Sequence, residues 1–356
     1  MVEWLELTAD PGRVHTEGRM VRAALENARD QVAALLGARN REVVFTSGAT
    51  EAANAATWGA LAAAPPGSAV LVSAVEHSCV REASSRSPQH PVIDLAVDSY
   101  GRIDPTAVSQ TLARHDVALV HCQVANHEVG TLQPVAQIVA DCRAAGVLVH
   151  VDAAQAAGHV AIDFASLGAD LMSVSGHKFG GPPGSGALLV RRGLRVAPLL
   201  VGGDQERARR AGMENAPAMI GLGVAAHEAG ANLERERAEA YARTERLRDA
   251  LASVEQVTLF GDPDAAGRLA HIVCGGVGGV EAEAVLLGLD QAGIAAHSGS
   301  ACSSEALQPS PVLQAMGVDA ERSLRLSVGW STTEADVDAA VVALPRVVTG
   351  LRALAG

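Results

Sequence analysis

One lysine stands out in a chain that uses arginine at every other Lys or Arg position. Of the 28 Lys and Arg residues, only residue 178 is lysine. A coding bias against lysine would explain its scarcity. Arginine, however, replaces lysine only as a charge, because a guanidinium does not lose its proton and become an amine nucleophile. Lys178 is therefore a candidate for amine catalysis, which requires lysine.

A turn of small residues lies where an expected strand meets an expected helix, in Thr46-Ser47-Gly48-Ala49-Thr50-Glu51. Backbone N–H groups at a helix N-terminus, together with the Thr50 hydroxyl, suit a phosphate. An ordinary helix cap by Ser47 or Thr50 is the alternative. The turn alone does not decide between the two interpretations.

An aspartate and the lysine both follow apolar, strand-like runs. Asp152 ends the run His150-Val151-Asp152, and Lys178 follows the run Ser173-Val174-Ser175 about 26 residues later. Neighbouring parallel strands would bring both side chains to one crevice. Asp152 alone is better explained as a cap of the next helix. Together, an amine, a partner for a pyridinium nitrogen and a phosphate turn are what a pyridoxal-phosphate site must supply.

Two residues nearer the carboxyl end add further candidate chemistry. Cys302 lies in a Ser/Gly-rich run and is expected to be a reactive thiol, whereas Cys274 lies in an apolar strand-like run and is expected in the core. Arg325 interrupts the apolar run 323–328. A buried arginine requires an anion, such as an amino-acid carboxylate or a structural ion-pair partner.

Composition narrows the classes of partner. The net charge of −12 disfavours direct nucleic-acid binding. No apolar run reaches the roughly 18 residues that a membrane helix needs, and no basic-then-apolar segment follows Met1, so we expect a cytoplasmic protein. The five cysteines are odd in number and lack a C-x-x-C pair, which indicates free thiols. His121, Cys122, His127 and Glu128 match no zinc pattern, so no metal site is expected.

The elements that must position these residues follow an α/β pattern. After a helix predicted at 19–36, apolar runs predict strands at 43–46, 69–75, 117–124, 147–152, 171–174 and 187–190, with alanine-rich helices between them. Beyond Gly221 we expect a long charged helix at 231–254, a strand at 271–274 and helices at 281–292 and 333–354. We therefore predict a large, mainly parallel-sheet domain at 16–220 and a smaller α+β domain formed by 1–15 and 221–356.

Taken in order, the motifs resemble the cysteine desulfurase family, in its NifS-like or IscS-like branch of the class V aminotransferase-type enzymes. The resemblance covers about 10–354 and implies the fold of type I pyridoxal-phosphate transferases. It rests on Ser47-Gly48-Ala49-Thr50-Glu51, Glu76-His77-Ser78, Asn126 to Gly130 with Gln133-Pro134, His150-Val151-Asp152 with Gln155, Ser175-Gly176-His177-Lys178, Ser298 to Cys302, and Gly202 to Arg207.

The resemblance implies a role for each matching position. Lys178 would bind pyridoxal 5'-phosphate as an imine and move protons, and Cys302 would be the catalytic thiol. His77 would stack on the cofactor ring and act as acid or base. The remaining implied contacts are Asp152 with the pyridine nitrogen, Gln155 and His127 with the ring oxygen, Ala49, Thr50, Ser175 and His177 with the phosphate, and Arg325 and Asn126 with the substrate.

The implied activity converts L-cysteine to L-alanine and leaves a persulfide on Cys302 for a sulfur-acceptor protein, as in iron–sulfur cluster assembly. A cytoplasmic homodimer is the implied assembly. The chain departs from the family at His127, where Asn is usual, at Met213, where Thr is usual, and in lacking an amino-terminal segment before Met1, so we expect either a more open pocket or a misassigned start. Alternatives are a weak or degenerate member that serves as a sulfur relay or docking partner, and a selenocysteine lyase or aminotransferase on the same fold.

Overall fold

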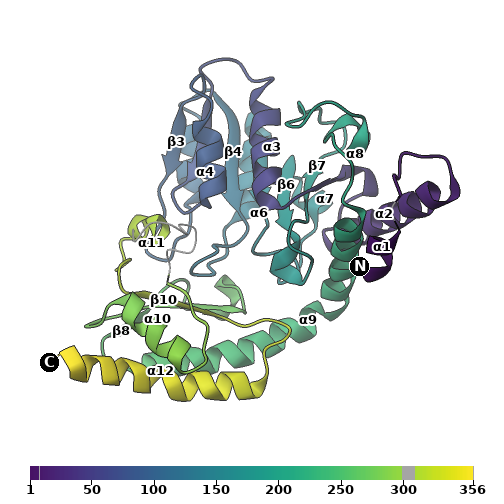
Figure 1. The fold of residues 1–356 in the computed structure, drawn as a ribbon. Coiled ribbons are helices and arrows are strands. Elements are labelled where there is room, and N and C mark those ends of the chain that lie inside the picture. The colour runs from purple at the N-terminus through teal and green to yellow at the C-terminus, as the bar shows by residue number, and fades with distance from the viewer. Residues whose placement is uncertain (8, 299–308, 356) are drawn as a thin grey trace.

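A seven-stranded sheet with helices on both faces dominates the computed structural model, which describes residues 1–7, 9–298 and 309–355 (Figure 1). The strand order is β1-β7-β6-β5-β4-β2-β3. The pairs from β3 to β6 are parallel, whereas β7 is antiparallel to β6 and to β1. Its strands are β1 (Val43–Thr46), β2 (Ala69–Ser73), β3 (Val92–Leu95), β4 (Val117–Gln123), β5 (Leu148–Asp152), β6 (Leu171–Ser175) and β7 (Gly186–Val190).

Alternate strand residues enter two separate cores, as the two-residue period of a strand requires. In β1, Val43 and Phe45 belong to one core and Val44 to the other. The first core is completed by α2 (Thr16–Leu35), α5 (Pro105–Leu112), α6 (Val135–Ala145), α7 (Phe164–Leu167) and the first half of α9 (Ala216–Ala252). The second is covered by α3 (Ala49–Leu61) and α4 (Ser78–Ser85). A sheet buried on both faces reads as continuous apolar runs, which explains why the sequence predicts most of its strands.

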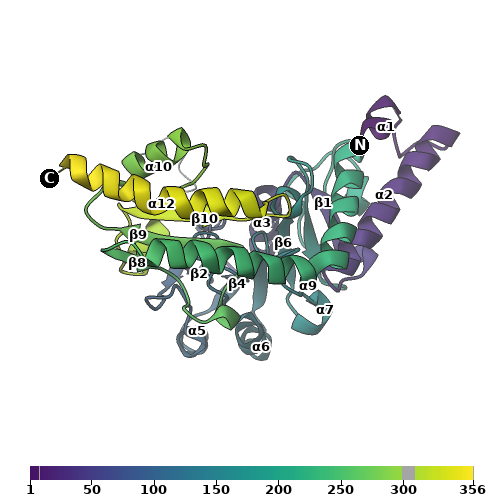
Figure 2. The same ribbon diagram turned by 90° about the horizontal axis from the view of Figure 1, so that it is seen from below.

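A third core surrounds a three-stranded antiparallel sheet in the order β10-β9-β8. Figure 2 shows α9 and α12 lying side by side beneath this sheet. The α/β fold class is confirmed, and the boundaries at residues 15 and 220 stay a prediction. The elements here are β8 (Val257–Leu259), β9 (Ile272–Val277), β10 (Ser323–Ser327), α10 (Ala282–Gln291), α11 (Pro311–Ala315) and α12 (Glu334–Ala355). Two further short helices are α1 (Val2–Glu6) and α8 (Gln205–Ala208).

The predicted start of the long helix is wrong. The sequence predicts a helix from residue 231, but α9 begins at Ala216 and spans 37 residues. The two glycines near its start do not end a helix. A Cβ on Gly223 would lie 2.5 Å from the Cα of Ala28 in α2, and one on Gly221 would lie 2.6 Å from Pro182. Glycine is needed at these positions because other elements pack closely against the helix.

The topology places the chemistry-bearing segments at one edge of the large sheet. Gln123 in β4 is paired with Asp152 in β5, and Ser175 in β6 is paired through Gly186 of β7 with Thr46 in β1. The carboxyl ends of β1, β2, β4, β5 and β6 therefore lie along the same edge. Ligands of such sheets bind outside the carboxyl ends of the strands. Among the described helices, none is long and apolar enough to span a membrane.

Candidate active site

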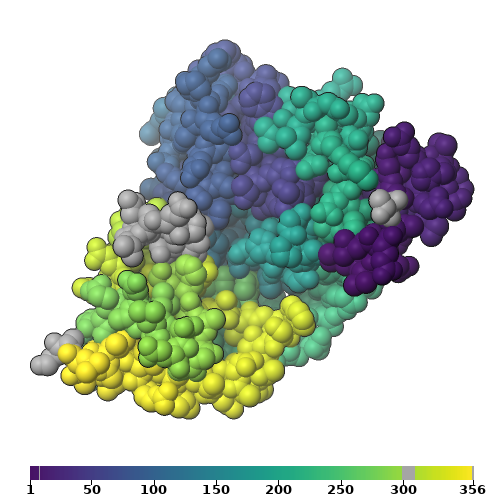
Figure 3. Space-filling view, in the orientation of Figure 1, coloured from purple at the N-terminus to yellow at the C-terminus, as the bar shows by residue number. Residues whose placement is uncertain are grey.

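A cavity of about 790 Å³ lies between the edge of the large sheet and the small sheet. Figure 3 shows the carboxyl-terminal part of the chain, in green and yellow, packed below the part that contains the large sheet. Five residues predicted from the sequence line this cavity: His127, Gln155, His177, Lys178 and Arg325. The first four come from the large sheet and Arg325 comes from β10, so the cavity depends on both sheets.

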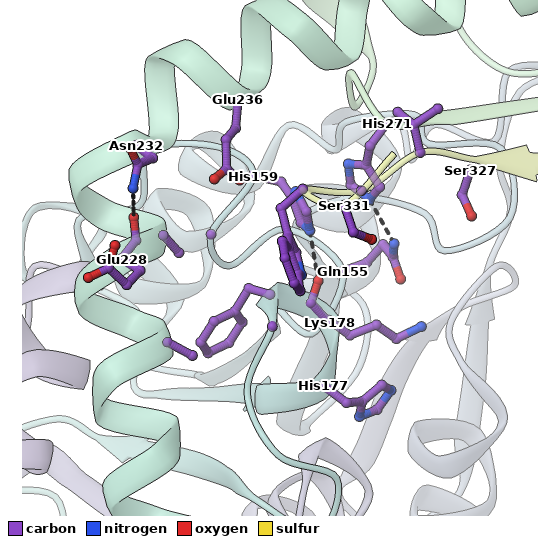
Figure 4. Close-up of a pocket in the computed structure, with 18 of the residues that line it drawn as sticks. Gln155, His159, His177, Lys178, Glu228, Asn232, Glu236, His271, Ser327 and Ser331 are labelled. Carbon is purple, nitrogen blue, oxygen red and sulfur yellow. Dashed lines mark hydrogen bonds between the residues drawn. The ribbon is translucent and has the colours of Figure 1, made fainter. Parts of the chain in front are cut away.

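Lys178 lies in a one-turn 3₁₀ helix, Gly176–Phe179, directly after β6. Figure 4 shows its side chain extending between Gln155 and His177. The Oγ atom of Ser175 lies 3.0 Å from Nδ1 of His177. Burial and the neighbouring Lys178 ammonium lower the pKa of His177. A neutral His177 can donate one hydrogen bond to an anion.

Asp152 is a buried carboxylate at the end of β5. Ser173 Oγ donates a hydrogen bond of 2.7 Å to its Oδ1, and the backbone N–H of Ala154 donates a second bond of 3.0 Å to the same oxygen. In the described part of the chain these bonds leave Oδ2 available. Buried carboxylates require a cation or donors, so Asp152 is suited to a protonated ring nitrogen.

The predicted phosphate turn joins β1 to the N-terminus of α3, which begins at Ala49. Thr50 and Ser47 are exposed, and the N–H groups of the first helical turn face out of the helix end. Glu51 holds the turn: its Oε2 accepts the N–H of Ser47 and its Oε1 accepts Nε of Arg210, both at 2.9 Å. Burial opposes ionisation of Glu51, but these bonds outweigh it and lower its pKa.

Two imidazole rings face each other beside this edge. The ring centroids of His77 and His127 are 5.2 Å apart in an edge-to-face arrangement. His77 caps α4 through its Nδ1 atom, which accepts the N–H of Cys79. Asn126 is fully buried; its Oδ1 accepts the N–H groups of Glu128 and Val129, and its Nδ2 donates to Val75 O. These bonds use one of the two amide hydrogens of Asn126 and hold its side chain in place.

Arg325 connects the small sheet to these histidines. Its Nη1 atom donates to the carbonyl oxygen of His127 at 3.1 Å, and its backbone exchanges two hydrogen bonds with His297. The guanidinium lines the cavity and retains donors for a carboxylate. Cys302 lies outside the described residues. Cys274, predicted to be a core residue, is fully buried in β9, and burial raises its thiol pKa to about 12.

Glu76 is a buried carboxylic acid whose pKa is raised in part by the charge of Asp152. Glu76 is 2 % exposed, and in the described structure neither of its oxygens has a hydrogen-bond partner. Burial and the Asp152 charge raise its pKa to about 8. The charges of His127 and Arg81 lower the pKa of Glu76 but do not offset its burial and the Asp152 charge, and a cationic ring nitrogen would add a further favourable charge. The residues present therefore fit pyridoxal phosphate.

Replacing Glu76 with glutamine is expected to flatten the pH dependence of stability. The folded state retains a proton on Glu76 that the unfolded chain has released, so the unfolding free energy falls as the pH rises from 4.5 to 8. The slope is at most roughly 1.4 kcal/mol per pH unit, which gives about 2 kcal/mol between pH 6 and 8 because the proton is half lost at pH 8. Urea unfolding of the cofactor-free protein should show Glu76→Gln gaining on the wild type over this interval.

The control for this experiment is Glu42→Gln. Glu42 is also buried, but its oxygens accept the backbone N–H groups of Arg39 and Arg192. It should not reproduce the relative gain. Equal pH slopes for the wild type and Glu76→Gln would show that Glu76 is ionised in the folded protein.

Sequence reasoning missed several residues at the site. Glu51 and Glu76 lie inside motifs recognised in the sequence, but no role was assigned to either. Ser173 could have been found from its place two residues before the end of β6, on the same face as Ser175. His159 and His271 carry no sequence signal of this kind, because their contacts join segments more than 100 residues apart.

Comparisons with known proteins agree with this geometry. Residues 3–340 match the family model Aminotransferase class-V. The IscS-like cysteine desulfurase of Mycobacterium tuberculosis is 42% identical over 353 residues, covering 95% of this chain and 89% of the relative. NifS, a cysteine desulfurase of Azotobacter vinelandii, is 40% identical over 354 residues, covering 98% and 87%. The crystal structure of a NifS-like protein from Rickettsia africae superposes with a TM-score of 0.88 at 28% identity, covering 97% and 93%.

The chain therefore belongs to the class-V aminotransferase family, and membership of this family implies pyridoxal phosphate as the cofactor. Within that family it is a cysteine desulfurase of the NifS/IscS-like group.

Proposed function

We propose that the protein converts L-cysteine to L-alanine and places the removed sulfur on Cys302 as a persulfide. The observation that carries the proposal is the shared cavity of Lys178 and Arg325. An amine from the large sheet and a guanidinium from the small sheet can address the two ends of one amino acid. Arg325 binds the carboxylate by charge-assisted hydrogen bonds.

The residues that would hold the cofactor follow the strand ends. Ala49 and Thr50, with Ser175 and His177, would hold its phosphate, and Asp152 would pair with the ring nitrogen. Gln155 and His127 would contact the ring oxygen, His77 would stack on the ring, and Lys178 would be the covalent anchor. When bound, pyridoxal phosphate supplies an electron-withdrawing ring that lets the substrate carbon lose its proton.

The chain's own groups then move protons and sulfur. The Lys178 amine takes the proton from the substrate Cα, while Arg325 keeps the carboxylate oriented. The Cys302 thiolate attacks the substrate sulfur; the C–S bond breaks, an S–S bond forms and a proton is delivered to Cβ. Return of the proton from Lys178 to Cα completes alanine. One cysteine and one thiol give one alanine and one persulfide, so the step needs no external oxidant or reductant.

The covalent chain limits how far Cys302 can lie from the cavity. His297 is bonded through its backbone to Arg325, a cavity residue. Cys302 is five positions after His297 in the chain, which limits the distance between their Cα atoms to about 18 Å. A thiol within this range supports the assignment of Cys302 as the sulfur carrier.

The wider setting of the enzyme is part of the proposal. We infer a homodimer because Trp58, Val201 and Met213 are each more than half exposed, at 55%, 77% and 62%, and a partner surface would cover them. A sulfur-acceptor protein would receive the persulfide in the cytoplasm, with iron–sulfur cluster assembly as the destination. The charge of −12 favours such a protein over nucleic acid.

Incubation of the purified, cofactor-loaded protein with L-cysteine and a thiol reductant should give alanine and sulfide in equal amounts. The measurement combines amino-acid analysis with sulfide detection. Without the reductant, alanine should stop at about one equivalent per chain, because the thiol remains occupied. Pyruvate and ammonia in place of alanine would contradict the proposal, since they indicate elimination without a sulfur carrier.

A further inference from the structure

A histidine of the small domain contacts two residues of the predicted cofactor site. His271 directly precedes β9 and is 5% exposed. Its Nε2 atom lies 2.9 Å from Nε2 of Gln155, which follows β5 of the large sheet. Figure 4 shows this bond above the Lys178 side chain. The small sheet therefore contributes a side chain that holds Gln155 in the cavity wall.

The same imidazole packs on a second histidine that reaches the lysine. The rings of His271 and His159 are stacked, with centroids 3.8 Å apart and planes inclined by 27°. His159 Nε2 lies 2.9 Å from the carbonyl oxygen of Lys178, and because a carbonyl only accepts, His159 is the donor. In Figure 4 the dashed line between His159 and Lys178 marks this contact. One ring of the small domain thus supports both Gln155 and the Lys178 backbone.

The environment of His271 favours its neutral form, and this limits the hydrogen bonds that the ring can make. Burial, followed by the charges of His159 and Lys178, holds the pKa of His271 well below its ordinary value. A neutral imidazole carries one hydrogen. When Gln155 donates to Nε2 of His271, that hydrogen is on Nδ1. With the amide turned over, Oε1 would instead accept it from Nε2. Either orientation uses one end of the amide on His271.

The other end of the Gln155 amide has no hydrogen-bond partner among the residues that the structure describes. In the described structure Oε1 of Gln155 is buried without a hydrogen bond, and so is Nδ1 of His271. An unpaired buried polar atom costs roughly 1–3 kcal/mol. Such a cost in a cavity wall is expected where a ligand supplies the missing bond. A cofactor ring oxygen could serve the free end of Gln155 while His271 fixes the other.

We propose that His271 is a positioning residue through which the small domain orients Gln155 and Lys178 for pyridoxal phosphate; this inference rests on the proposed function. Gln155 has three side-chain torsions, and restricting them before binding reduces the entropy lost when the cofactor binds. His271 itself does not touch the reacting atoms. Its effect is on the geometry of the two residues that do.

Two substitutions separate its hydrogen bond from its packing. His271→Phe keeps an aromatic ring against His159 but removes the bond to Gln155. His271→Gln removes the ring but can place a polar atom where Nε2 lies. Each apoprotein is titrated with pyridoxal phosphate, and affinity is followed by absorbance. We expect His271→Phe to weaken binding about tenfold, the equivalent of one net hydrogen bond, and His271→Gln to recover most of this loss.

His90→Phe is the matched control for replacing a buried histidine. His90 is 6% exposed, bonds through Nδ1 to Ser68 O at 2.9 Å, and does not line the cavity. It should bind the cofactor like the wild type, and thermal unfolding shows whether each variant is folded. In folded variants, wild-type affinity in His271→Phe, or equal losses in the two His271 variants, would overturn the proposal.

Kinetics give a second readout for the same variants. Because Arg325 is untouched, His271→Phe should lower kcat and leave KM for cysteine within about twofold. A rise in KM alone would overturn the positioning role. Failure of the proposed function itself looks different, since the wild type would then form no lysine-bound cofactor and no alanine.

Discussion

Replacing Lys178 with alanine should remove the covalent attachment of pyridoxal phosphate and lower alanine formation by at least about 10³-fold. The variant loses both the anchoring amine and a proton-transfer group, and proton transfer alone contributes roughly 10²–10⁴-fold to such reactions. No other lysine exists in the chain to replace it. The phosphate turn at 46–51 is unchanged, so some cofactor can still bind without a covalent bond.

Borohydride reduction followed by peptide mass analysis measures this attachment directly. In the wild type, the label should fall on the peptide that contains Lys178, and Lys178→Ala should carry none. Lys178→Arg is the informative control, because it keeps the positive charge but cannot form the bond. Equal labelling of the wild type and Lys178→Arg, or label on another residue in the wild type, would refute the assignment.

The second large effect is expected for Cys302→Ser, which should keep the cofactor absorbance and lose sulfur release by at least about 10³-fold. The absorbance depends on the Lys178 site, which this substitution leaves intact. A serine hydroxyl ionises far less readily than a thiol and is a much poorer sulfur acceptor. The two variants should therefore separate cofactor attachment from sulfur transfer.

Trapping the persulfide supplies the measurement. After reaction with one equivalent of cysteine and alkylation, the peptide containing Cys302 should carry one additional sulfur atom. Cys142→Ala is the matched control, because burial raises the pKa of the Cys142 thiol to about 12 and leaves it un-ionised near neutral pH. Full sulfide release by Cys302→Ser, or persulfide found on Cys142, would show that another thiol carries the sulfur.

The two predictions rest on different kinds of evidence. Lys178 lies in a turn after a central strand, where Nε2 of His159 donates to its carbonyl oxygen. Cys302 is assigned through its chain position after His297 and through the chemistry of a thiol. The first assignment gains support from cavity geometry and the second from the motif and the family, so independent experiments are needed for each.

Local patterns in the sequence predict the α/β class, six strands of the large sheet and the placement of Asp152 and Lys178 at one edge. These features follow from local patterns: continuous apolar runs mark strands buried on both faces, and parallel strands end at a common edge. The single lysine needed no structure to be recognised as chemically distinct.

Contacts between distant parts of the chain can be seen only in the folded structure. The start of α9 depends on α2 packing against Gly223, and the contact between His271 and Gln155 joins positions 116 residues apart. The burial of Glu76 and the effect of Asp152 on its pKa are likewise properties of the folded chain. Burial and long-range contact are properties of the folded chain, and no periodicity of neighbouring residues encodes them.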